Sequence, residues 1–123
     1  MSLKIAVEHS NPLTISLDGR LDSHTAPELD KTLDAVLAKS GIARLVFELS
    51  QLQYLSSAGI RCFIRARKAI EPKGGKVAIV NPQPAVRKVL DIVKAIPPGG
   101  IFSSVAELDA YLDDMQRQVR DQE

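Results

Sequence analysis

The amino-acid sequence predicts a single α/β domain with a mixed, mostly parallel sheet, an antiparallel N-terminal hairpin and about four helices. Two stretches with strand-like alternation come first, and helix-like and strand-like stretches then alternate toward the C-terminus. The length of 123 residues is enough for one buried core and too short for two. We therefore expect one domain over residues 1–123, with a core at about 3–113 and a polar, frayed tail after about residue 116.

The first third of the chain predicts two strands and one helix. Apolar and polar residues alternate over 3–7 and again over 13–17, with a turn-forming break between them, which is typical of an antiparallel hairpin. A helix over about 26–39 follows, because Thr25 supplies a capping hydroxyl and Glu28 lies three residues later, as in a capping box.

The middle of the chain predicts a strand, a helix and another strand. Residues 44–49 are expected to form the third strand, and a second helix begins at Ser57 and runs toward Pro72. The short, apolar and β-branched run 76–80 is typical of a strand covered on both faces. We therefore expect this strand at the centre of the sheet.

The last third predicts two further helices. The third helix is expected to bury Val86, Val89, Leu90 and Val93 and to stop at the Pro/Gly segment 97–100. Residues 101–102 are a candidate short last strand. Ser104 and Glu107 then form a second capping box, before a helix whose apolar stripe consists of Val105, Leu108, Leu112, Met115 and Val119.

Composition excludes several classes of function. The 16 Lys and Arg residues balance 15 Asp and Glu, so the formal charge of +1 supplies no field for nucleic acid or an anionic membrane surface. One cysteine, Cys62, excludes a disulfide framework, and two separated histidines, His9 and His24, are too few for a histidine-rich metal site. The N-terminus does not read as a signal peptide, and no apolar run spans a bilayer. We expect a cytoplasmic module without cofactor or metal.

The segment LQYLSSAGI, residues 52–60, is the candidate site for chemistry, because a strand there runs into the start of a helix. Three interpretations of Ser57 compete. It is an N-cap, a hydrolase nucleophile or a phosphoacceptor whose phosphate meets the helix amides. The nucleophile is disfavoured, since Leu55 stands where a nucleophile elbow needs glycine, and both histidines precede the strand.

Three segments carry a resemblance to the STAS domain of bacterial anti-sigma-factor antagonists. LDGRLDSHTAPEL, residues 17–29, resembles the first family signature, and residues 52–60 resemble the second. Residues 76–80 with the turn Asn81-Pro82, and the helix segment 86–90, look like the third. The resemblance covers about residues 3–113 and implies a STAS-type fold in a protein that is not an enzyme.

The resemblance implies partner switching. The unphosphorylated antagonist binds an anti-sigma factor that is also a serine kinase, phosphorylation breaks the complex, and a serine phosphatase restores it. By this match Ser57 is the phosphorylated serine, and Ser56 is a second candidate acceptor. Many antagonists carry Asp where this chain has Ser56, and a second Ser or Thr where it has Ala58. The implied partner-contacting residues are Asp22, Ser56, Ser57, Ala58, Gly59, Arg61 and Arg65.

Several of these residues also have a purely structural interpretation. Asp22 suits a turn before a helix, and it is equally a candidate acid at the partner contact. Arg61, Arg65 and Lys68 recur at helical spacing, either as a solvated face or as a docking surface for an acidic patch or nucleotide of the kinase. Cys62, in the same helix, is interpreted as a small core residue.

Two other functions remain open from the sequence. One is a STAS scaffold or sensory subunit of a transporter or signalling complex, in which Ser57 is only a cap. The other is a small nucleotide-binding domain that uses the amides at the same helix start.

Overall fold

The computed structural model describes residues 2–39, 41–95 and 104–122. Four strands, four α-helices and a short 3-10 turn at Glu71–Lys73 follow one another in the order expected for an α/β domain. The strands are β1 (Leu3–Glu8), β2 (Leu13–Leu21), β3 (Arg44–Leu55) and β4 (Lys76–Val80). The helices are α1 (Ala26–Leu37), α2 (Ser57–Ile70), α3 (Pro84–Ala95) and α4 (Val105–Asp121). The predicted fold class is confirmed.

The sheet has the strand order β1-β2-β3-β4, in which β1 and β2 are antiparallel and the other neighbours are parallel. The predicted mixed sheet and N-terminal hairpin are therefore confirmed. In the parallel pair, Leu21 at the end of β2 lies opposite Leu55 at the end of β3. This register places the loop after β2 beside the junction between β3 and α2.

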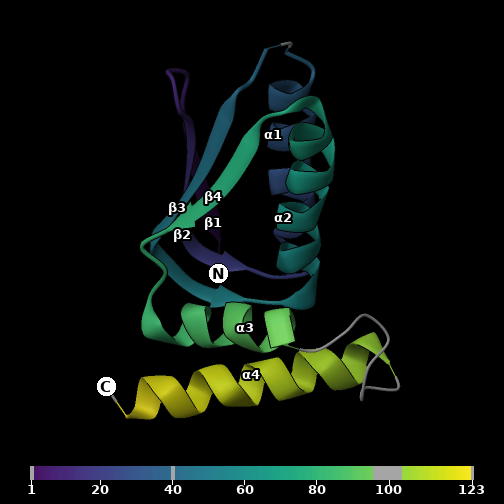
Figure 1. The fold of residues 1–123 in the computed structure, drawn as a ribbon. Coiled ribbons are helices and arrows are strands. Elements are labelled where there is room, and N and C mark those ends of the chain that lie inside the picture. The colour runs from purple at the N-terminus through teal and green to yellow at the C-terminus, as the bar shows by residue number, and fades with distance from the viewer. Residues whose placement is uncertain (1, 40, 96–103, 123) are drawn as a thin grey trace.

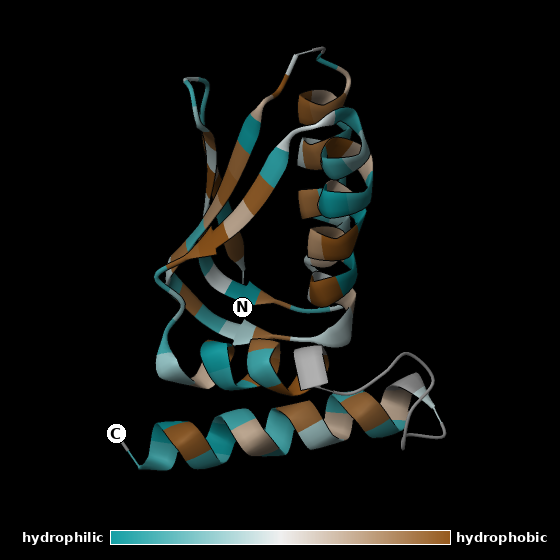
Figure 2. Cartoon of the chain, viewed as in Figure 1, coloured by the Kyte–Doolittle hydropathy of each residue, from teal (hydrophilic) through white to brown (hydrophobic). Residues whose placement is uncertain are grey.

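Two helices cover one face of the sheet, and two close one end of it. Figure 1 shows α1 and α2 side by side along the sheet, with α3 and α4 lying across its lower end. Hydrophobic and hydrophilic residues follow one another along the strands and helices, as the colours of Figure 2 show, and the buried apolar residues of the sheet and helices form one core cluster. The rings of Phe47 on β3 and Phe63 on α2 meet there with centroids 4.7 Å apart. The largest fully buried apolar side chains belong to this core: Ile15, Leu17, Leu21, Leu29, Leu33, Leu45, Phe47, Leu49, Leu52, Leu55 and Leu112.

Strand β4 is not central, which contradicts the sequence prediction. It is an edge of the sheet formed by the described residues, and its side chains are exposed or only partly buried. Val77 and Ile79 pack against the core, whereas Ala78 between them is exposed. An apolar run of five residues looks the same in a central strand and in an edge strand, because alternation is hidden when alanine occupies the outer face.

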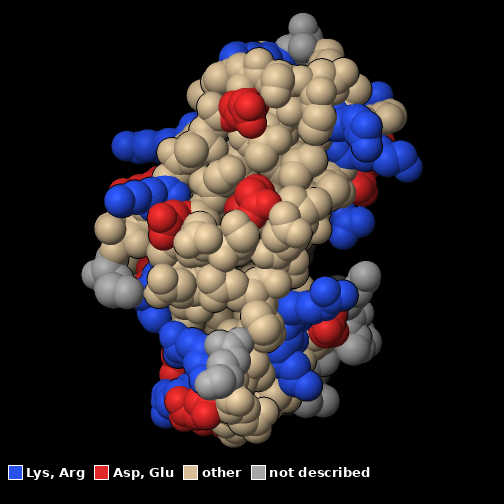
Figure 3. All heavy atoms as spheres, turned by 90° about the vertical axis from the view of Figure 1, so that its left-hand side faces the viewer, with Lys and Arg blue, Asp and Glu red and all other residues tan. Residues whose placement is uncertain are grey.

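The face of the sheet turned away from α1 and α2 is uncovered over much of its area. Figure 3 shows this side as a largely uncharged surface with scattered acidic groups, and with most Lys and Arg side chains toward its margins. No single-sign patch of the kind that attracts nucleic acid lies on this side, in agreement with the balanced composition.

The two predicted capping boxes have different outcomes. In α4 the capping bond of Ser104 is present, because Ser104 Oγ accepts a hydrogen bond of 3.1 Å from the Glu107 amide. At α1 the prediction is wrong, because the Thr25 side chain makes no capping bond to the helix. The Thr25 hydroxyl instead donates to the Arg20 carbonyl at 2.8 Å and accepts from the Asp22 amide at 2.9 Å. It therefore holds the loop after β2 closed.

The C-terminal helices confirm the predicted apolar faces in part and correct the predicted tail. Val86 and Val89 of α3 are buried, and Leu112 of α4 is fully buried. Helix α4 continues through Asp121, so the chain is helical where a frayed tail from Gln116 was expected. The predicted stop at 97–100 and the candidate strand at 101–102 lie outside the described residues.

Gly59 in the first turn of α2 is the basis of a stability prediction. A Cβ at this position would lie 2.6 Å from Leu21 Cγ and 2.7 Å from Leu55 Cδ1. Both leucine side chains are fully buried and cannot move aside freely. We expect Gly59→Ala to lower the free energy of unfolding by about 1–3 kcal/mol through overpacking. Urea denaturation measures this, and a midpoint equal to or above that of the unmodified chain would contradict it.

Candidate functional site

The junction between β3 and α2 consists of one residue. Strand β3 ends at Leu55, Ser56 follows in extended conformation, and α2 begins at Ser57. The Ser56 amide donates a 2.9 Å hydrogen bond to the carbonyl of Leu21, the last residue of β2. The Ser56 carbonyl accepts the first helical bond, from Ile60. The start of α2 is therefore fixed to the ends of both parallel strands.

The interpretation of Ser57 as the N-cap is wrong, because the cap position belongs to Ser56. Neither serine side chain makes a capping hydrogen bond. The two residues are only 5% and 9% exposed, and both Oγ atoms are buried without a hydrogen-bond partner among the described residues. Buried hydroxyls are normally paired, so an unpaired couple at a helix start needs an explanation beyond folding.

A carboxylate from the C-terminal helix occupies the start of α2. Asp109 Oδ1 accepts a 2.9 Å hydrogen bond from the Ser57 amide. A negative charge is favourable there, because the first amides of a helix lack intrahelical partners and form the positive end of its dipole. The anion that the sequence analysis expected from a phosphate or nucleotide is thus supplied by the chain itself. Nothing local in the sequence pairs residues 52 positions apart, so this contact was not predicted.

Gln116 on α4 binds the last residue of β3. Its Oε1 accepts from the Leu55 amide at 2.9 Å, and its Nε2 donates to the Leu55 carbonyl at 2.9 Å. The side chain is fully buried, and Nε2 also donates to the Leu112 carbonyl at 3.1 Å. Gln116 therefore acts as a strand partner for Leu55. Its spacing of four and eight residues from Leu112 and Leu108 is the signal that could have identified it as buried.

An arginine and a tyrosine on neighbouring strands pack together beside this junction. The Arg20 guanidinium lies 3.8 Å from the centroid of the Tyr54 ring, a cation–π contact. Burial raises the pKa of Tyr54, and the Asp113 carboxylate on α4 raises it further. Arg20 also forms an ion pair of 3.7 Å with Asp22.

Asp22 holds the loop between β2 and α1. Its Oδ1 accepts hydrogen bonds from the His24 amide at 3.0 Å and the Thr25 amide at 3.1 Å. Burial opposes ionisation of Asp22, but these hydrogen bonds and the charge of Arg20 outweigh it and lower the pKa of the carboxyl. The structural interpretation as a turn carboxylate is confirmed. Its predicted partner contact stays a prediction.

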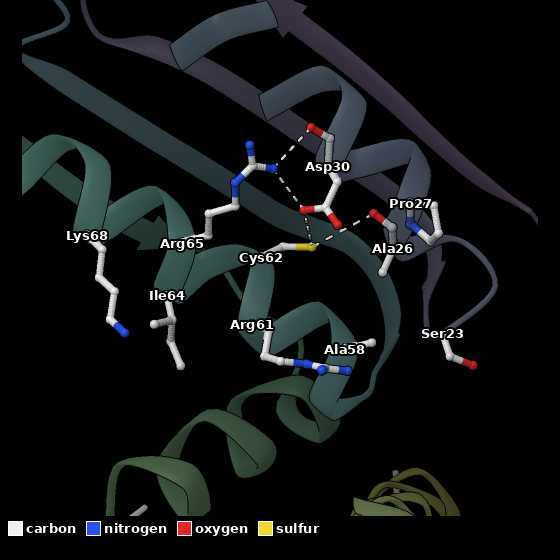
Figure 4. Close-up of a pocket in the computed structure, with 10 residues that line it drawn as sticks. All are labelled: Ser23, Ala26, Pro27, Asp30, Ala58, Arg61, Cys62, Ile64, Arg65 and Lys68. Carbon is white, nitrogen blue, oxygen red and sulfur yellow. Dashed lines mark hydrogen bonds and ion pairs between the residues drawn. The ribbon is translucent and has the colours of Figure 1, made fainter. Parts of the chain in front are cut away.

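The predicted basic stripe on α2 divides into two kinds of side chain. Arg65 bonds to Asp30 at 3.1 Å and also pairs with Asp34, so two carboxylates of α1 meet its charge. Arg61 and Lys68 are exposed, and Figure 4 shows them extending away from Asp30. A hollow of about 630 Å³ lies between α1 and α2. Ser23, Ala26, Pro27, Asp30, Ala58, Arg61, Cys62, Ile64, Arg65 and Lys68 line it.

Cys62 is a core residue, as predicted. It is 2% exposed, and Sγ lies 3.5 Å from Asp30 Oδ1 and 3.9 Å from the Ala26 carbonyl. Burial, reinforced by the Asp30 carboxylate, raises the pKa of the thiol to about 12. The thiol is therefore protonated and unreactive in the folded chain.

Gly59 has a packing position rather than a surface position. It is buried against Leu21 and Leu55, whereas its neighbour Ala58 lines the hollow.

In the part of the chain that the structure describes, no cluster of His, Cys, Asp and Glu is arranged to hold a metal ion. Within the same residues, no helix has the length and apolar character to cross a membrane.

Comparison with known proteins assigns this architecture to a family. The STAS-domain profile matches residues 4–108. The anti-sigma F factor antagonist of Paenibacillus polymyxa is 31% identical over 93 residues, which cover 75% of this chain and 80% of that protein. The chain belongs to the STAS-domain family of anti-sigma-factor antagonists. Members of this family are regulators and not enzymes.

Solved structures carry the same fold. An anti-sigma factor antagonist from Mycobacterium paratuberculosis is 27% identical with a TM-score of 0.68, covering 97% of this chain and 95% of that one. SpoIIAA, an anti-sigma factor antagonist solved in its unphosphorylated form, has a TM-score of 0.65 at 21% identity, over 74% and 81% of the chains. The family profile ends at residue 108, so Asp109 and Gln116 of this STAS domain lie beyond the matched region.

Asp22 in this STAS domain gives a prediction of pH dependence. Because its pKa is lower in the folded chain than the ordinary 3.8, the carboxylate stabilises the fold above the unfolded-state pKa, and the contribution is lost as pH falls through the folded-state pKa. We expect Asp22→Ala to lower the free energy of unfolding by about 1 kcal/mol at pH 7. The gap from the unmodified chain should close below about pH 4.

Urea unfolding at pH 7 and at pH 3 measures the effect of Asp22→Ala. The control is Asp18→Ala, because Asp18 is an exposed aspartate on the same strand-loop segment. That control should change stability by less than about 0.5 kcal/mol. A deficit for Asp22→Ala that persists unchanged at pH 3 would show that the carboxylate charge is not its source.

Proposed function

We propose that this STAS domain is a cytoplasmic anti-sigma-factor antagonist that changes partners through phosphorylation of Ser57. The observation that carries the proposal is the position of Ser57, which is the first residue of α2 directly after β3, within the segment that matches the family's second signature. A relative of the same fold, SpoIIAA, has been solved in both unphosphorylated and phosphorylated forms. We extend that property to Ser57 of this chain.

The proposed partner is an anti-sigma factor that is also a serine kinase. Ser57 Oγ attacks the γ-phosphorus of ATP, and the new O–P bond replaces the bond from that phosphorus to the bridging oxygen of ADP. The hydroxyl proton passes to a base on the kinase, and ADP leaves with the bond electrons. A serine phosphatase reverses the modification by hydrolysis, which returns the hydroxyl and inorganic phosphate.

The added phosphate acts through its charge. It brings about −1.5 to −2 charges, which is enough to turn the formal charge of +1 negative. At the contact with the anti-sigma factor this charge loses solvation, and the Asp109 carboxylate bonded to the Ser57 amide repels it. A loss of about 3 kcal/mol weakens binding by roughly a hundredfold.

The proposed contact surface extends from the serine pair along α2. Ala58, Arg61 and Ile64 line the hollow between α1 and α2, and Ile64 is 41% exposed. Arg61 and Lys68 add positive charge beside this apolar side chain. Such a surface fits a partner with an acidic and apolar face, and rim charges of this kind mainly raise the association rate. Asp22 and Arg65 are held in place by bonds within the chain, so at the contact surface they provide a fixed shape and no free charge for the partner.

A STAS scaffold or sensory subunit is the second candidate. The burial of the Ser57 hydroxyl favours it, since a serine that no kinase reaches is only structural. Incubation with ATP and the kinase that co-purifies with the chain discriminates the two. A mass increase of one phosphate on the Ser57 peptide supports the switch, and its absence with binding intact supports the scaffold.

Substitution of Ser57 tests the charge switch. We expect Ser57→Asp to weaken binding of the co-purifying anti-sigma factor by roughly tenfold to a hundredfold, because a carboxylate supplies part of the phosphate charge. Ser57→Ala should bind as tightly as the unmodified chain and should resist release by ATP. Titration calorimetry measures both affinities.

The matched control is Ser10→Asp. Ser10 is exposed in the β1–β2 loop, and Figure 1 shows that loop at the opposite end of the sheet from the start of α2. The same charge placed there should leave the affinity unchanged. Equal affinities of Ser57→Asp and Ser57→Ala would overturn the proposed mechanism.

A further inference from the structure

We propose that α4 is a latch that covers the switch serine, so that a partner reaches Ser57 only after α4 has moved off the β3–α2 junction. The proposal rests on the proposed function, in which Ser57 is the residue that partners read. It adds a closed state, held by Asp109 and Gln116, to the two phosphorylation states. The latch is defined here as residues 105–121 in contact with the junction.

Gln116 supplies the geometric part of the latch. Its side chain bonds to both the amide and the carbonyl of Leu55, each at 2.9 Å, and is fully buried. Leu55 is the last residue of β3 and lies two positions before Ser57. When α4 is in place, Gln116 occupies both the amide and the carbonyl of Leu55, which then cannot bind a partner chain.

Asp109 supplies the electrostatic part. Its carboxylate accepts the Ser57 amide, the group that would otherwise favour an anion on the same residue. A phosphate on Ser57 Oγ is attached to the residue whose amide holds Asp109, so two anions would share one helix start. Their repulsion opposes the closed state. Phosphorylation and closure of α4 are therefore antagonistic in this geometry.

The buried serine hydroxyls show that the closed state is incompatible with phosphoryl transfer. Both Oγ atoms are buried and lack a partner among the described residues. In-line attack on ATP needs the Ser57 Oγ exposed on the side of the incoming phosphorus. The hydroxyl must therefore become accessible first, and α4 is the element whose carboxylate touches the same residue.

Bonds within α4 allow it to leave the junction without losing its helical structure. Its own side chains pair along it, with Arg117 bonded to Asp113 at 2.6 Å and Gln118 bonded to Asp114 at 3.0 Å. Ser104 caps its first turn. Among its described side chains only Leu112 and Gln116 are buried, and Leu108 is partly buried against the core. Movement of α4 exposes these leucines and the side of α3 they cover, while the sheet and its packing against α1 and α2 stay intact, so the opening costs less than unfolding of the core.

The two events are linked by reciprocity. If closure of the latch disfavours a negative charge on Ser57 at equilibrium, then a negative charge on Ser57 disfavours closure by the same factor. This supplies two independent experiments, one that loosens the latch and measures access to Ser57, and one that charges Ser57 and measures the latch.

The first experiment uses Ser57→Cys and alkylation by iodoacetamide, followed by peptide mass spectrometry. Gln116→Ala is added to loosen the latch without changing any charge near the thiol. Gln118→Ala is the matched control, because Gln118 is an exposed glutamine two residues further along the same helix. Buried Cys62, whose pKa of about 12 keeps it unreactive, reports global unfolding in the same sample.

We expect Gln116→Ala to speed alkylation at position 57 about tenfold or more, because loss of two buried hydrogen bonds shifts an opening equilibrium by at least that factor. Gln118→Ala should leave the rate within about twofold. Cys62 should stay unlabelled in both. The latch is overturned if the rate at position 57 is unchanged by Gln116→Ala, or if it rises only together with that of Cys62.

The second experiment charges the serine. Ser57→Asp should speed amide hydrogen exchange over residues 109–118 several-fold relative to the neutral Ser57→Asn, and adding Asp109→Asn should remove the difference. Equal exchange in the Ser57→Asp and Ser57→Asn chains would overturn the electrostatic part.

Phosphorylation by the co-purifying kinase separates failure of the latch from failure of the function. If Gln116→Ala speeds both alkylation and phosphorylation of Ser57, both proposals are supported. If alkylation responds but Ser57 is phosphorylated in neither chain, the latch is supported and the switch function fails. If Ser57 is phosphorylated equally fast with and without Gln116→Ala, the latch is overturned and the function is retained.

Discussion

The hydrogen bond from the Ser56 amide to the Leu21 carbonyl is the constraint on which the junction depends. It joins the ends of two parallel strands to the start of α2, and only one residue separates β3 from that helix. A connection this short has no slack, so the direction of the Ser57 amide is set by the sheet. A new charge on Ser57 is therefore not absorbed by a shift of α2. The response passes to whatever packs against the helix start, and in this chain that is α4.

The residues around the junction also keep the strand ends and the start of α2 in fixed positions. Gly59 leaves room for Leu21 and Leu55 beneath the first turn of α2, which draws the helix close to the strand ends. Arg20 lies against the Tyr54 ring and pairs with Asp22, so the loop after β2 is tied to the outside of β3. Core packing on one side and charged bonds on the other hold the strands and α2 as one body. The C-terminal helix packs on this body through Leu108 and Leu112 and bonds to the junction through Asp109 and Gln116.

Much of the fold could be predicted from the sequence because its signals are local. The alternation of β1 and β2, the start of α2 at Ser57 and the Ser104 cap each depend on neighbouring residues. The position of β4 depends on which strand it pairs with, and a five-residue apolar run carries no information about that pairing.

The candidate site was predicted only in part, for the same physical reason. The segment that contains Ser57 has a recognisable motif, but its contacts come from α4, more than 50 positions away. Gln116 was assigned to a frayed tail because its side chain is polar, although it continues the stripe of Leu108 and Leu112. From sequence alone, a glutamine whose side-chain amide is buried against a strand end cannot be told from one that faces solvent. The difference depends on the position of the Leu55 backbone, which Gln116 binds.

The buried thiol of Cys62 has a consequence for how the domain takes part in signalling. Oxidants and disulfide exchange act on the thiolate, and a thiol with a pKa of about 12 in the core offers almost none at neutral pH. The chain has no other cysteine. Oxidants therefore have no accessible cysteine thiolate in the folded domain, and the proposed phosphorylation of Ser57 does not depend on the redox state of Cys62.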